Sequence, residues 1–396
     1  MGEIILKEGR EKSLLRHHPW IFSGAINKVL GSPKAGETVR ILSAKGDFLA
    51  QAAYNPLSQI TCRVWSRNDH EIINPEFFEK QLAKAIRLRD MQTDLIQSDS
   101  YRLVHGESDG IPGLILDRYG EVYVIQFLTA GVEFWRDDIM DAIIKLTECQ
   151  TLYERSDVDV RELEGLPLKS GLLRGQEFNN PFTIVENRLR FLVDIKDGHK
   201  TGYYLDQREN RKLIRALSNE RKVLDCFSYT GGFSLNALAG NAQSIIMVDA
   251  SEDALELAKK NIQLNDLDLN KVSFIDQDVF NYLRLLRDKG KSFDLIVLDP
   301  PKFAPTAAQA EKAARGYKDI NLLALKLLTP GGYLMTFSCS GGVGEELFQK
   351  IIAGAALDAG VDALILKRLQ QGVDHPVALN FPEGAYLKGF IIQKTN

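Results

Sequence analysis

The sequence predicts an α/β protein that ends in a doubly wound, Rossmann-like sheet. From residue 222 onward, short apolar runs alternate with helical patterns, which is typical of such a sheet. The first 72 residues instead show short apolar runs separated by turn residues, which indicates a small β-rich module. A length of 396 residues leaves room for a central α+β region between them. We therefore expect three domains, spanning residues 1–72, 73–185 and 186–396.

Composition indicates an ordinary globular protein rather than a membrane or secreted one. Apolar residues make up 44% of the chain and charged residues 26%, and the longest apolar runs are far too short for a bilayer span. The N-terminus lacks the hydrophobic core of a secretory signal, so we expect a cytoplasmic location. Four scattered cysteines without a C-x-x-C pair argue against disulfides and against a metal site.

Short strands dominate the expectation for the first domain, because glycine and proline bound its apolar runs. These strands are expected at residues 20–26, 38–43, 48–54 and 60–65. The central domain should begin with a helix at Pro75, a residue favoured at the first helical position. Strands near 114–117, 122–128 and 151–155 and a helix near 132–147 should follow.

Four basic side chains near the N-terminus are candidates for local contact with RNA phosphates: Lys7, Arg10, Lys12 and Arg16. A net charge of −4 and a pI near 6.0 argue against a protein that coats nucleic acid generally. Nearby glutamates dilute the cluster, so an ordinary solvated surface carries equal weight as an explanation.

The last domain should open with a β-hairpin over residues 188–205. Apolar and polar residues alternate on both sides of Asp197-Gly198, a dipeptide preferred in tight hairpin turns. A helix over 207–217 should lead into the sheet. Its seven strands are expected near residues 222–227, 244–249, 271–276, 293–298, 331–338, 361–367 and 387–393.

The stretch 223–251 has the pattern of a nucleoside-binding unit: a strand, a small-residue turn, a helix and a second strand. Gly231 and Gly232 allow backbone amides to approach a ligand at the helix N-terminus, and Asp249 can accept hydrogen bonds from two ribose hydroxyls. The dinucleotide fingerprint G-x-G-x-x-G is absent, which favours S-adenosylmethionine over a nicotinamide cofactor.

Three later landmarks also stand at the carboxyl ends of predicted strands, where open α/β sheets bind ligands. Asp278 could bond an adenine amine, Asp299-Pro300-Pro301-Lys302 forms a rigid turn, and Cys339 lies in F-S-C-S-G. Lys302 occupies a place where many base N-methylating enzymes carry an aromatic residue, which shifts weight away from N-methylation. A D-P-P turn that merely terminates a strand is the structural alternative.

Cys339 indicates the chemistry. Cytosine C5 becomes nucleophilic when a thiolate adds to C6, and a cysteine at a strand tip before a glycine-rich turn and a helix is suited to this role. Free cysteine is more often a small buried hydrophobe, and this reading is preferred for Cys62, Cys149 and Cys226.

The motifs together carry a family resemblance. They are R-E-K-S-L-L-R-H-H-P-W-I-F-S-G, G-E-S-D-G-I-P-G-L-I-L-D-R-Y-G, G-H-K-T-G-Y-Y-L-D-Q-R, D-C-F-S-Y-T-G-G-F, D-P-P-K-F, R-G-Y-K-D-I-N and T-F-S-C-S-G. Over nearly its whole length the chain resembles the ribosomal RNA large subunit methyltransferase I family. The resemblance implies a PUA-like RNA-binding fold for the first domain, a class I methyltransferase fold for the last, and C5 methylation of one cytosine in 23S ribosomal RNA.

The resemblance also implies roles for individual residues. Gln207 and Arg208 would reach the methionine end of the cofactor; Phe227, Ser228 and Gly231 would form its cradle; Asp249 with Ser251, and Asp278 with Val279, would hold ribose and adenine. Cys339 matches the nucleophile of RNA cytosine-C5 methyltransferases, with Asp299 and Lys302 beside it.

Two departures stand out: Asp225 replaces the asparagine of the family motif, and Lys302 replaces the second cysteine of the wider group. The base that releases the product is therefore open, with Asp299 or water as candidates. Methylation of another ribosomal RNA base, a guanine included, and a non-catalytic RNA-binding ribosome assembly factor remain alternatives. The sequence leaves open the target nucleotide, naked RNA or assembled subunit as substrate, and the oligomeric state, a homodimer included.

Overall fold

A computed structural model describes residues 1–147, 149–303 and 310–396. The described chain forms two compact units. The first comprises Met1–Ile184, Val193–Leu205 and Val373–Gly384, and the second comprises Val185–Leu192, Asp206–Gly372 and Ala385–Asn396. A late segment of the chain thus belongs to the first unit, which no local sequence pattern indicated. The expected division into three domains stays a prediction.

The N-terminal part of the first unit is a six-stranded mixed sheet in the order β2-β6-β5-β4-β1-β3. Within this sheet, β1 and β4 pair parallel, and the other neighbouring strands pair antiparallel. Its elements are β1 (Gly2–Leu6), α1 (Lys12–Leu15), β2 (Trp20–Ile21), β3 (Ile26–Leu30), β4 (Thr38–Leu42), β5 (Phe48–Tyr54) and β6 (Cys62–Ser66). The expected strand at 20–26 is wrong, because a 3-10 turn at Ser23–Ala25 separates β2 from β3.

A second sheet of the same unit has five strands in the order β11-β10-β9-β8-β7. The expected helix at Pro75 is confirmed: Asn74 caps it by accepting a 3.0 Å hydrogen bond from the Phe77 amide, and Phe78 and Leu82 bury its apolar face. The elements are α2 (Pro75–Asp90), α3 (Thr93–Ile96), β7 (Ser100–His105), β8 (Leu114–Tyr119), β9 (Val122–Phe127), α4 (Ala130–Phe134), α5 (Arg136–Thr147), β10 (Thr151–Ser156), α6 (Val160–Leu163) and β11 (Lys169–Arg174).

The hairpin expected over 188–205 is wrong. The observed two-stranded sheet joins β12 (Phe182–Glu186) to β13 (Leu189–Val193). Its turn is Asn187-Arg188, both with positive φ (51° and 66°), as type I′ turns require. No strand follows Asp197-Gly198 because Thr201 and Tyr203 instead hydrogen-bond the Tyr119 hydroxyl, at 2.9 and 3.2 Å.

The second unit contains the doubly wound sheet, with seven strands in the order β16-β15-β14-β17-β18-β20-β19. Its neighbouring strands pair parallel, except that β20 is antiparallel to both β18 and β19. The strands are β14 (Lys222–Cys226), β15 (Ser244–Asp249), β16 (Val272–Asp276), β17 (Phe293–Leu298), β18 (Leu328–Ser338), β19 (Ala363–Gln370) and β20 (Lys388–Lys394). The seven expected strands are therefore confirmed.

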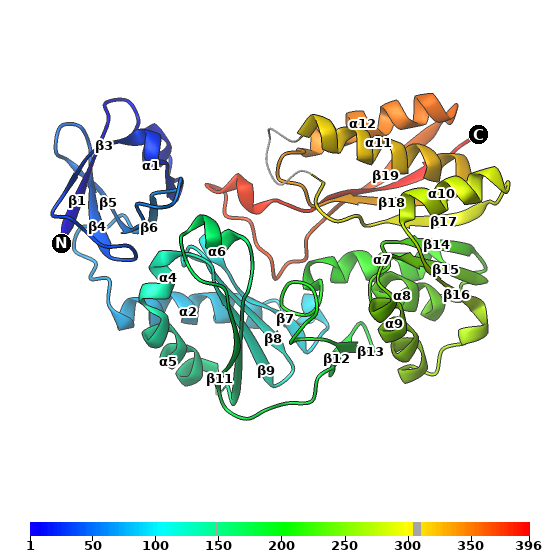
Figure 1. Cartoon of the computed structure of the whole chain (residues 1–396), viewed down its shortest axis with the longest axis horizontal. Helices are drawn as coiled ribbons and strands as arrows, with labels where there is room; N and C mark the ends of the chain where they lie inside the picture. The colour runs from blue at the N-terminus through cyan, green and yellow to red at the C-terminus, as the bar shows by residue number, and fades with distance from the viewer. Residues whose placement is uncertain (148, 304–309) are drawn as a thin grey trace. The chain divides into compact units, whose positions relative to one another are not determined.

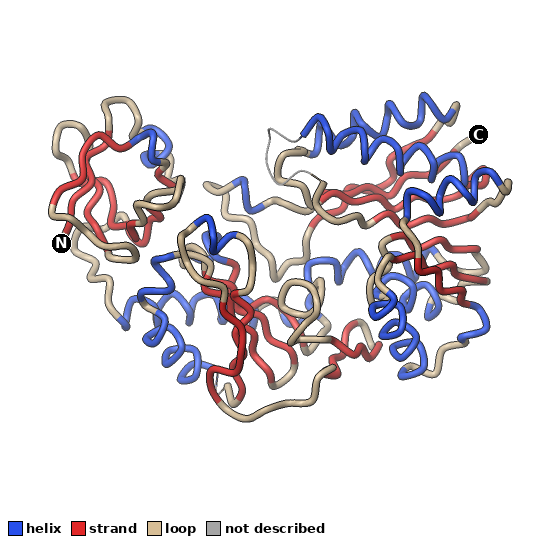
Figure 2. The backbone as a smooth tube through the Cα atoms, viewed as in Figure 1, coloured by secondary structure: helices blue, strands red, loops and turns tan. Residues whose placement is uncertain are grey.

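Helices cover both faces of this sheet. Figure 1 shows α10 (Val279–Asp288), α11 (Ala310–Leu327) and α12 (Glu345–Ala359) on one face, and α7 (Arg208–Leu217), α8 (Gly232–Ala239) and α9 (Glu252–Leu264) on the other. The connections between strands and helices are the loops drawn in tan in Figure 2. A core of buried residues that includes Leu224, Ile296 and Phe348 fills the space between the sheet and α10–α12. The loops at the carboxyl ends of the parallel strands are consequently held on a rigid support.

Candidate active site

The central strands bring the predicted motifs to one edge of the sheet. Leu298 at the end of β17 is in register with Cys226 at the end of β14 and with Thr336 in β18. The turns that follow these strands must therefore lie close together. The Cys339 sulfur is 3.9 Å from the Pro300 carbonyl, so the candidate nucleophile lies against the D-P-P turn, and its side chain is partly exposed.

The turn after β14 has a strained backbone. Phe227 and Tyr229 have positive φ values of 61° and 47°, and Gly231 caps α8 with φ 85°. This positive φ favours glycine at Gly231, and a Cβ there would in addition lie 2.9 Å from the Leu235 side chain and 3.1 Å from Ala258. Within the described residues, the buried hydroxyl of Ser228 in this turn has no hydrogen-bond partner, which leaves it available to a ligand.

Asp249 is oriented by two backbone amides. One carboxylate oxygen accepts a 2.8 Å hydrogen bond from the Tyr229 amide, and the other accepts a 3.0 Å bond from the Ser251 amide. An ionised carboxylate has about four lone-pair sites, so acceptor capacity remains for a diol. The β14 turn and the end of β15 thus form one connected cradle.

Two other predicted cofactor residues cap helices. The Ser251 hydroxyl accepts from the Ala254 amide at 3.2 Å at the start of α9, and the Asp278 carboxylate accepts from the Asn281 amide at 2.9 Å at the start of α10. Both are exposed, whereas Val279 is buried in the core. Their contact with a cofactor stays a prediction.

Gln207, Arg208 and Asp299 lie in one buried polar region. Gln207 and Arg208 are buried at the start of α7, and the Gln207 side chain hydrogen-bonds Asp299. Although part of Asp299 is exposed, burial of its carboxyl raises the pKa to about 7, and the negative charges of Asp206 and Asp225 add to this effect. A carboxyl with such a pKa can both hold and release a proton near neutral pH.

Two further residues at this edge were not predicted for the site. Lys388, the first residue of β20, donates a 2.8 Å hydrogen bond to the Ser340 carbonyl, directly after Cys339. The Tyr317 hydroxyl of α11 lies 2.9 Å from the Ser340 hydroxyl. Tyr317 stands in the R-G-Y-K-D-I-N motif, which was a usable signal, but Lys388 is recognisable only from strand pairing. Lys302 is exposed on the D-P-P turn; burial is the main cause that lowers the pKa of Lys388, and the charge of Lys302 adds to it.

The predicted RNA-binding side chains belong to the first unit. Lys7, Arg10, Lys12 and Arg16 are all exposed, and Lys7 donates a 3.0 Å hydrogen bond to the Gly24 carbonyl. Exposure permits phosphate contact, and the assignment stays a prediction.

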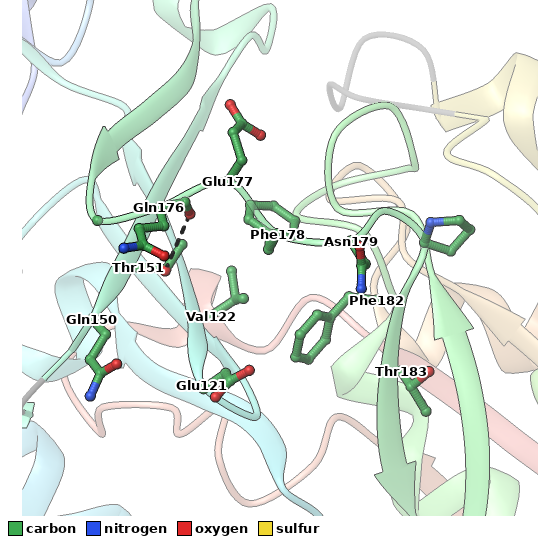
Figure 3. Close-up of a pocket in the computed structure, with 12 residues that line it drawn as sticks. Glu121, Val122, Gln150, Thr151, Gln176, Glu177, Phe178, Asn179, Phe182 and Thr183 are labelled. Atoms are coloured by element: carbon green, nitrogen blue, oxygen red, sulfur yellow. Dashed lines mark hydrogen bonds between the residues drawn. The ribbon is translucent and has the colours of Figure 1, made fainter.

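The first unit also contains an open pocket of about 990 Å³ (Figure 3). The rings of Phe178 and Phe182 and the amide side chains of Gln150 and Gln176 line it, together with Glu121 and Glu177 among others. None of the predicted site residues lies in it. Its two acidic side chains make it unsuitable for a phosphate.

Across residues 1–147, 149–303 and 310–396, no group of three or more His, Cys, Asp or Glu side chains is arranged to hold a metal ion. In the same described ranges, no helix is both long enough and apolar enough to cross a membrane.

Comparison with known proteins identifies both parts of the chain. A family model described as S-adenosylmethionine-dependent methyltransferase matches residues 170–376, and a PUA-like domain model matches residues 4–67. Curated proteins named ribosomal RNA large subunit methyltransferase I, from Cronobacter sakazakii and Yersinia pseudotuberculosis, are each 50% identical over 387 residues, covering 98% of both chains.

Solved structures show the same fold. A structure from Streptococcus mutans, described as a SAM-dependent methyltransferase, superposes with a TM-score of 0.85 at 24% identity and covers 99% of this chain and 100% of its own. A methyltransferase complexed with SAH matches with the same TM-score and identity.

The described residues fit the cofactor of this class. The buried Ser228 hydroxyl, without a partner among the described residues, and the Asp249 carboxylate held by backbone amides are polar groups suited to a nucleoside. The dinucleotide-binding motif G-x-G-x-x-G is absent from the turn after β14, so a pyrophosphate-containing cofactor is not indicated. The family match, the fold and this chemistry agree on dependence on S-adenosylmethionine. The chain therefore belongs to the ribosomal RNA large subunit methyltransferase I family.

Proposed function

We propose that this protein methylates C5 of one cytosine in 23S ribosomal RNA, in the cytoplasm, through a covalent bond from Cys339 to the base. The contact between Cys339 and the D-P-P turn is the observation that carries the proposal. The partly exposed thiol thus contacts the turn that begins with Asp299, a residue whose carboxyl has a pKa raised to about 7 by burial and by the charges of Asp206 and Asp225. The names of the 50%-identical relatives support large-subunit ribosomal RNA as the substrate.

The cofactor would be held by groups on three strands and α7. Asp249 would accept hydrogen bonds from the ribose hydroxyls, because its carboxylate is fixed by two amides and keeps spare lone pairs. Ser228 would use its partnerless hydroxyl, while Phe227 and Gly231 shape the turn. Asp278 and Val279, with Ser251, would lie along the adenosine, and Gln207 and Arg208 along the methionine end. When bound, S-adenosylmethionine supplies an electrophilic methyl carbon, and the electron pair of the broken S–CH₃ bond stays on the departing sulfur.

Cys339 would act as the nucleophile. Its thiolate adds an electron pair to C6 of the cytosine, which makes the displaced C5=C6 pair nucleophilic at C5. After methylation, a base removes the C5 proton, the C–H pair restores the C5=C6 bond, and the C6–S pair returns to Cys339. The base must be extruded from its stack to reach the thiol.

Asp299 is our candidate for the base that removes the C5 proton. A general base works best when its pKa is near the operating pH, and burial with neighbouring negative charge raises the pKa of Asp299 to about 7. Gln207 hydrogen-bonds the same carboxyl and would orient it. Lys302, exposed on the same turn, would face the substrate where related enzymes carry a second cysteine.

A mechanism-based trap tests the proposal. The protein is incubated with the cofactor and 23S RNA transcribed with 5-fluorocytidine in place of cytidine. Fluorine at C5 cannot leave as a proton, so the methylated adduct should accumulate and survive denaturing electrophoresis. Cys339→Ala should abolish the adduct and reduce methyl transfer to normal RNA by several orders of magnitude. Cys149→Ala, a buried cysteine of the first unit, serves as the matched control and should retain both.

Methyl transfer without an adduct would reject the covalent mechanism. A methylated product other than 5-methylcytosine would reject the substrate atom. RNA binding with no methyl transfer to any ribosomal RNA would instead favour the assembly-factor alternative.

A further inference from the structure

Lys388 of β20 contacts the loop that carries the candidate nucleophile, Cys339. β20 runs antiparallel to β18, and Lys388 is paired in register with Ser338, the residue that precedes Cys339. Its side chain is only 7% exposed. A lysine is rarely buried to this extent unless it has partners, because removing an ammonium from water is costly.

The partner of Lys388 is the loop that carries Cys339. The ammonium donates to the Ser340 carbonyl at 2.8 Å, while the Tyr317 hydroxyl lies 2.9 Å from the Ser340 hydroxyl. Ser340 itself is fully buried. Ser340, the residue after Cys339, is thus fixed by hydrogen bonds from Lys388 of β20 and with Tyr317 of α11. These bonds restrict the backbone that carries the Cys339 thiol.

The charges around this loop show that Lys388 and Cys339 interact. Burial lowers the pKa of Lys388, the negative charge of a Cys339 thiolate raises it, and the positive charge of Lys302 lowers it. Burial raises the pKa of Tyr317, and Cys339 contributes in the same direction. Lys388 on β20 and Tyr317 on α11 thus both interact electrostatically with Cys339, Lys302 on the turn after β17 interacts with Lys388, and the carboxyl of Asp299 belongs to the turn that Cys339 contacts. Of these, Lys388 is the cation in the protein interior.

We propose that Lys388 is a positioning residue that holds Cys339 in its reactive thiolate form, by placing a buried ammonium beside the sulfur and by fixing the Ser340 carbonyl. The inference rests on the proposed role of Cys339 as nucleophile. A cation next to a cysteine favours the thiolate, which is the form that attacks carbon. In the absence of such a cation, a partly buried thiol would be protonated at neutral pH.

The test measures the reactivity of Cys339 without RNA or cofactor. The full-length protein is alkylated with iodoacetamide at a series of pH values from 6 to 10, and mass spectrometry follows the peptide that contains Cys339. The other three cysteines are buried, so the readout is specific to this site. The midpoint of the wild-type rate profile should lie below the value of about 8.5 expected for a free thiol.

Three variants separate charge from structure. Lys388→Gln keeps a donor for the Ser340 carbonyl but removes the charge, and it should raise the midpoint by about one pH unit and slow alkylation at pH 7 about tenfold. Lys388→Arg keeps the charge and should stay near the wild type. Lys394→Gln is the matched control: Lys394 is on the same strand and donates to the Leu325 and Leu328 carbonyls at 3.3 and 2.8 Å, away from the cysteine loop. Its midpoint should not move.

If the alkylation rate of wild-type Cys339 had its midpoint at or above about pH 8.5, the inference would be wrong. This result needs no variant, so the inference can be tested even if Lys388→Gln does not fold. An unchanged midpoint in a folded Lys388→Gln protein would do the same. The failure of the proposed function looks different: a low midpoint together with no 5-fluorocytidine adduct would reject covalent cytosine methylation and leave an activated thiol to be explained.

Discussion

Asp225 carries a buried carboxyl in β14, and its replacement by asparagine tests what ionisation costs in this core. The residue is 1% exposed, and one of its oxygens accepts a 2.6 Å hydrogen bond from the Ser234 hydroxyl. The other oxygen has no partner within the described part of the chain. Burial raises the pKa of Asp225 to about 7; the Ser234 hydrogen bonds oppose this shift, and the charge of Asp249 adds to it. Asparagine is the residue that the family motif carries at this position.

The sign of the effect follows from proton binding. Unfolded Asp225 ionises near the ordinary value of 3.8, whereas in the folded protein it keeps its proton up to about pH 7. Its contribution to stability is therefore complete below pH 3.8 and declines as the pH rises through 7. A shift of about three pKa units corresponds to an upper limit of roughly 4 kcal/mol, of which about 3 kcal/mol falls between pH 5 and 8.

Asp225→Asn should remove this part of the pH dependence. Between pH 5 and pH 8, the stability of the variant relative to the wild type should increase by up to about 3 kcal/mol. The three tryptophans, Trp20, Trp65 and Trp135, all belong to the first unit, so scanning calorimetry is preferable to tryptophan fluorescence. For a unit of this size, 1 kcal/mol shifts Tm by roughly 2–4 °C.

Asp276→Asn makes the same substitution at an exposed carboxyl at the end of β16 and should leave the pH dependence unchanged. If Asp225→Asn shows the same loss of Tm between pH 5 and 8 as the wild type, the carboxyl is not held neutral in the fold and the reasoning fails.

Other site residues lead to separate predictions. Asp249→Ala should weaken cofactor binding by about 2 kcal/mol, because the charged acceptor for the ribose diol is lost; unchanged affinity by calorimetry would exclude Asp249 from the site. As a base, Asp299 must lose its proton, so kcat should rise with pH through about 7. Asp299→Asn should abolish this rise of kcat with pH and lower kcat by about 10²- to 10⁴-fold. If kcat of the variant still rose through about pH 7, a group other than Asp299 would be the base. Arg10→Ala and Lys12→Ala should each weaken RNA binding and reduce the slope of log Kd against log salt concentration by about 1. Filter binding at several salt concentrations measures this slope, and an unchanged slope would indicate an ordinary solvated surface.

The strands of the catalytic sheet could be predicted because each is a buried apolar run that ends at a distinctive residue. Asp249, Asp299 and Cys339 could be singled out as candidates for the same reason, since parallel strands direct their carboxyl ends to one edge. The hairpin at Asp197-Gly198 was mispredicted because a favourable turn dipeptide is only a local signal. Here Thr201 and Tyr203 hydrogen-bond Tyr119, about 80 residues away along the chain. Gly231 was predicted from its type alone, and the structure adds that its positive φ of 85° favours glycine there, while its place in a cofactor site stays a prediction.

The sequence by itself determined the alternation of strands and helices, the small-residue turn after β14 and the residue types available at the ends of the strands, because these depend on periodicity and on side-chain chemistry. Only the tertiary structure decided which charges surround Cys339 and Asp299. Lys388 reaches Ser340 because β20 pairs antiparallel with β18, and the pKa of Asp299 is raised because burial removes water and brings Asp206 and Asp225 near. Strand pairing and burial join residues that are distant in the chain, and a local pattern contains no information about such contacts.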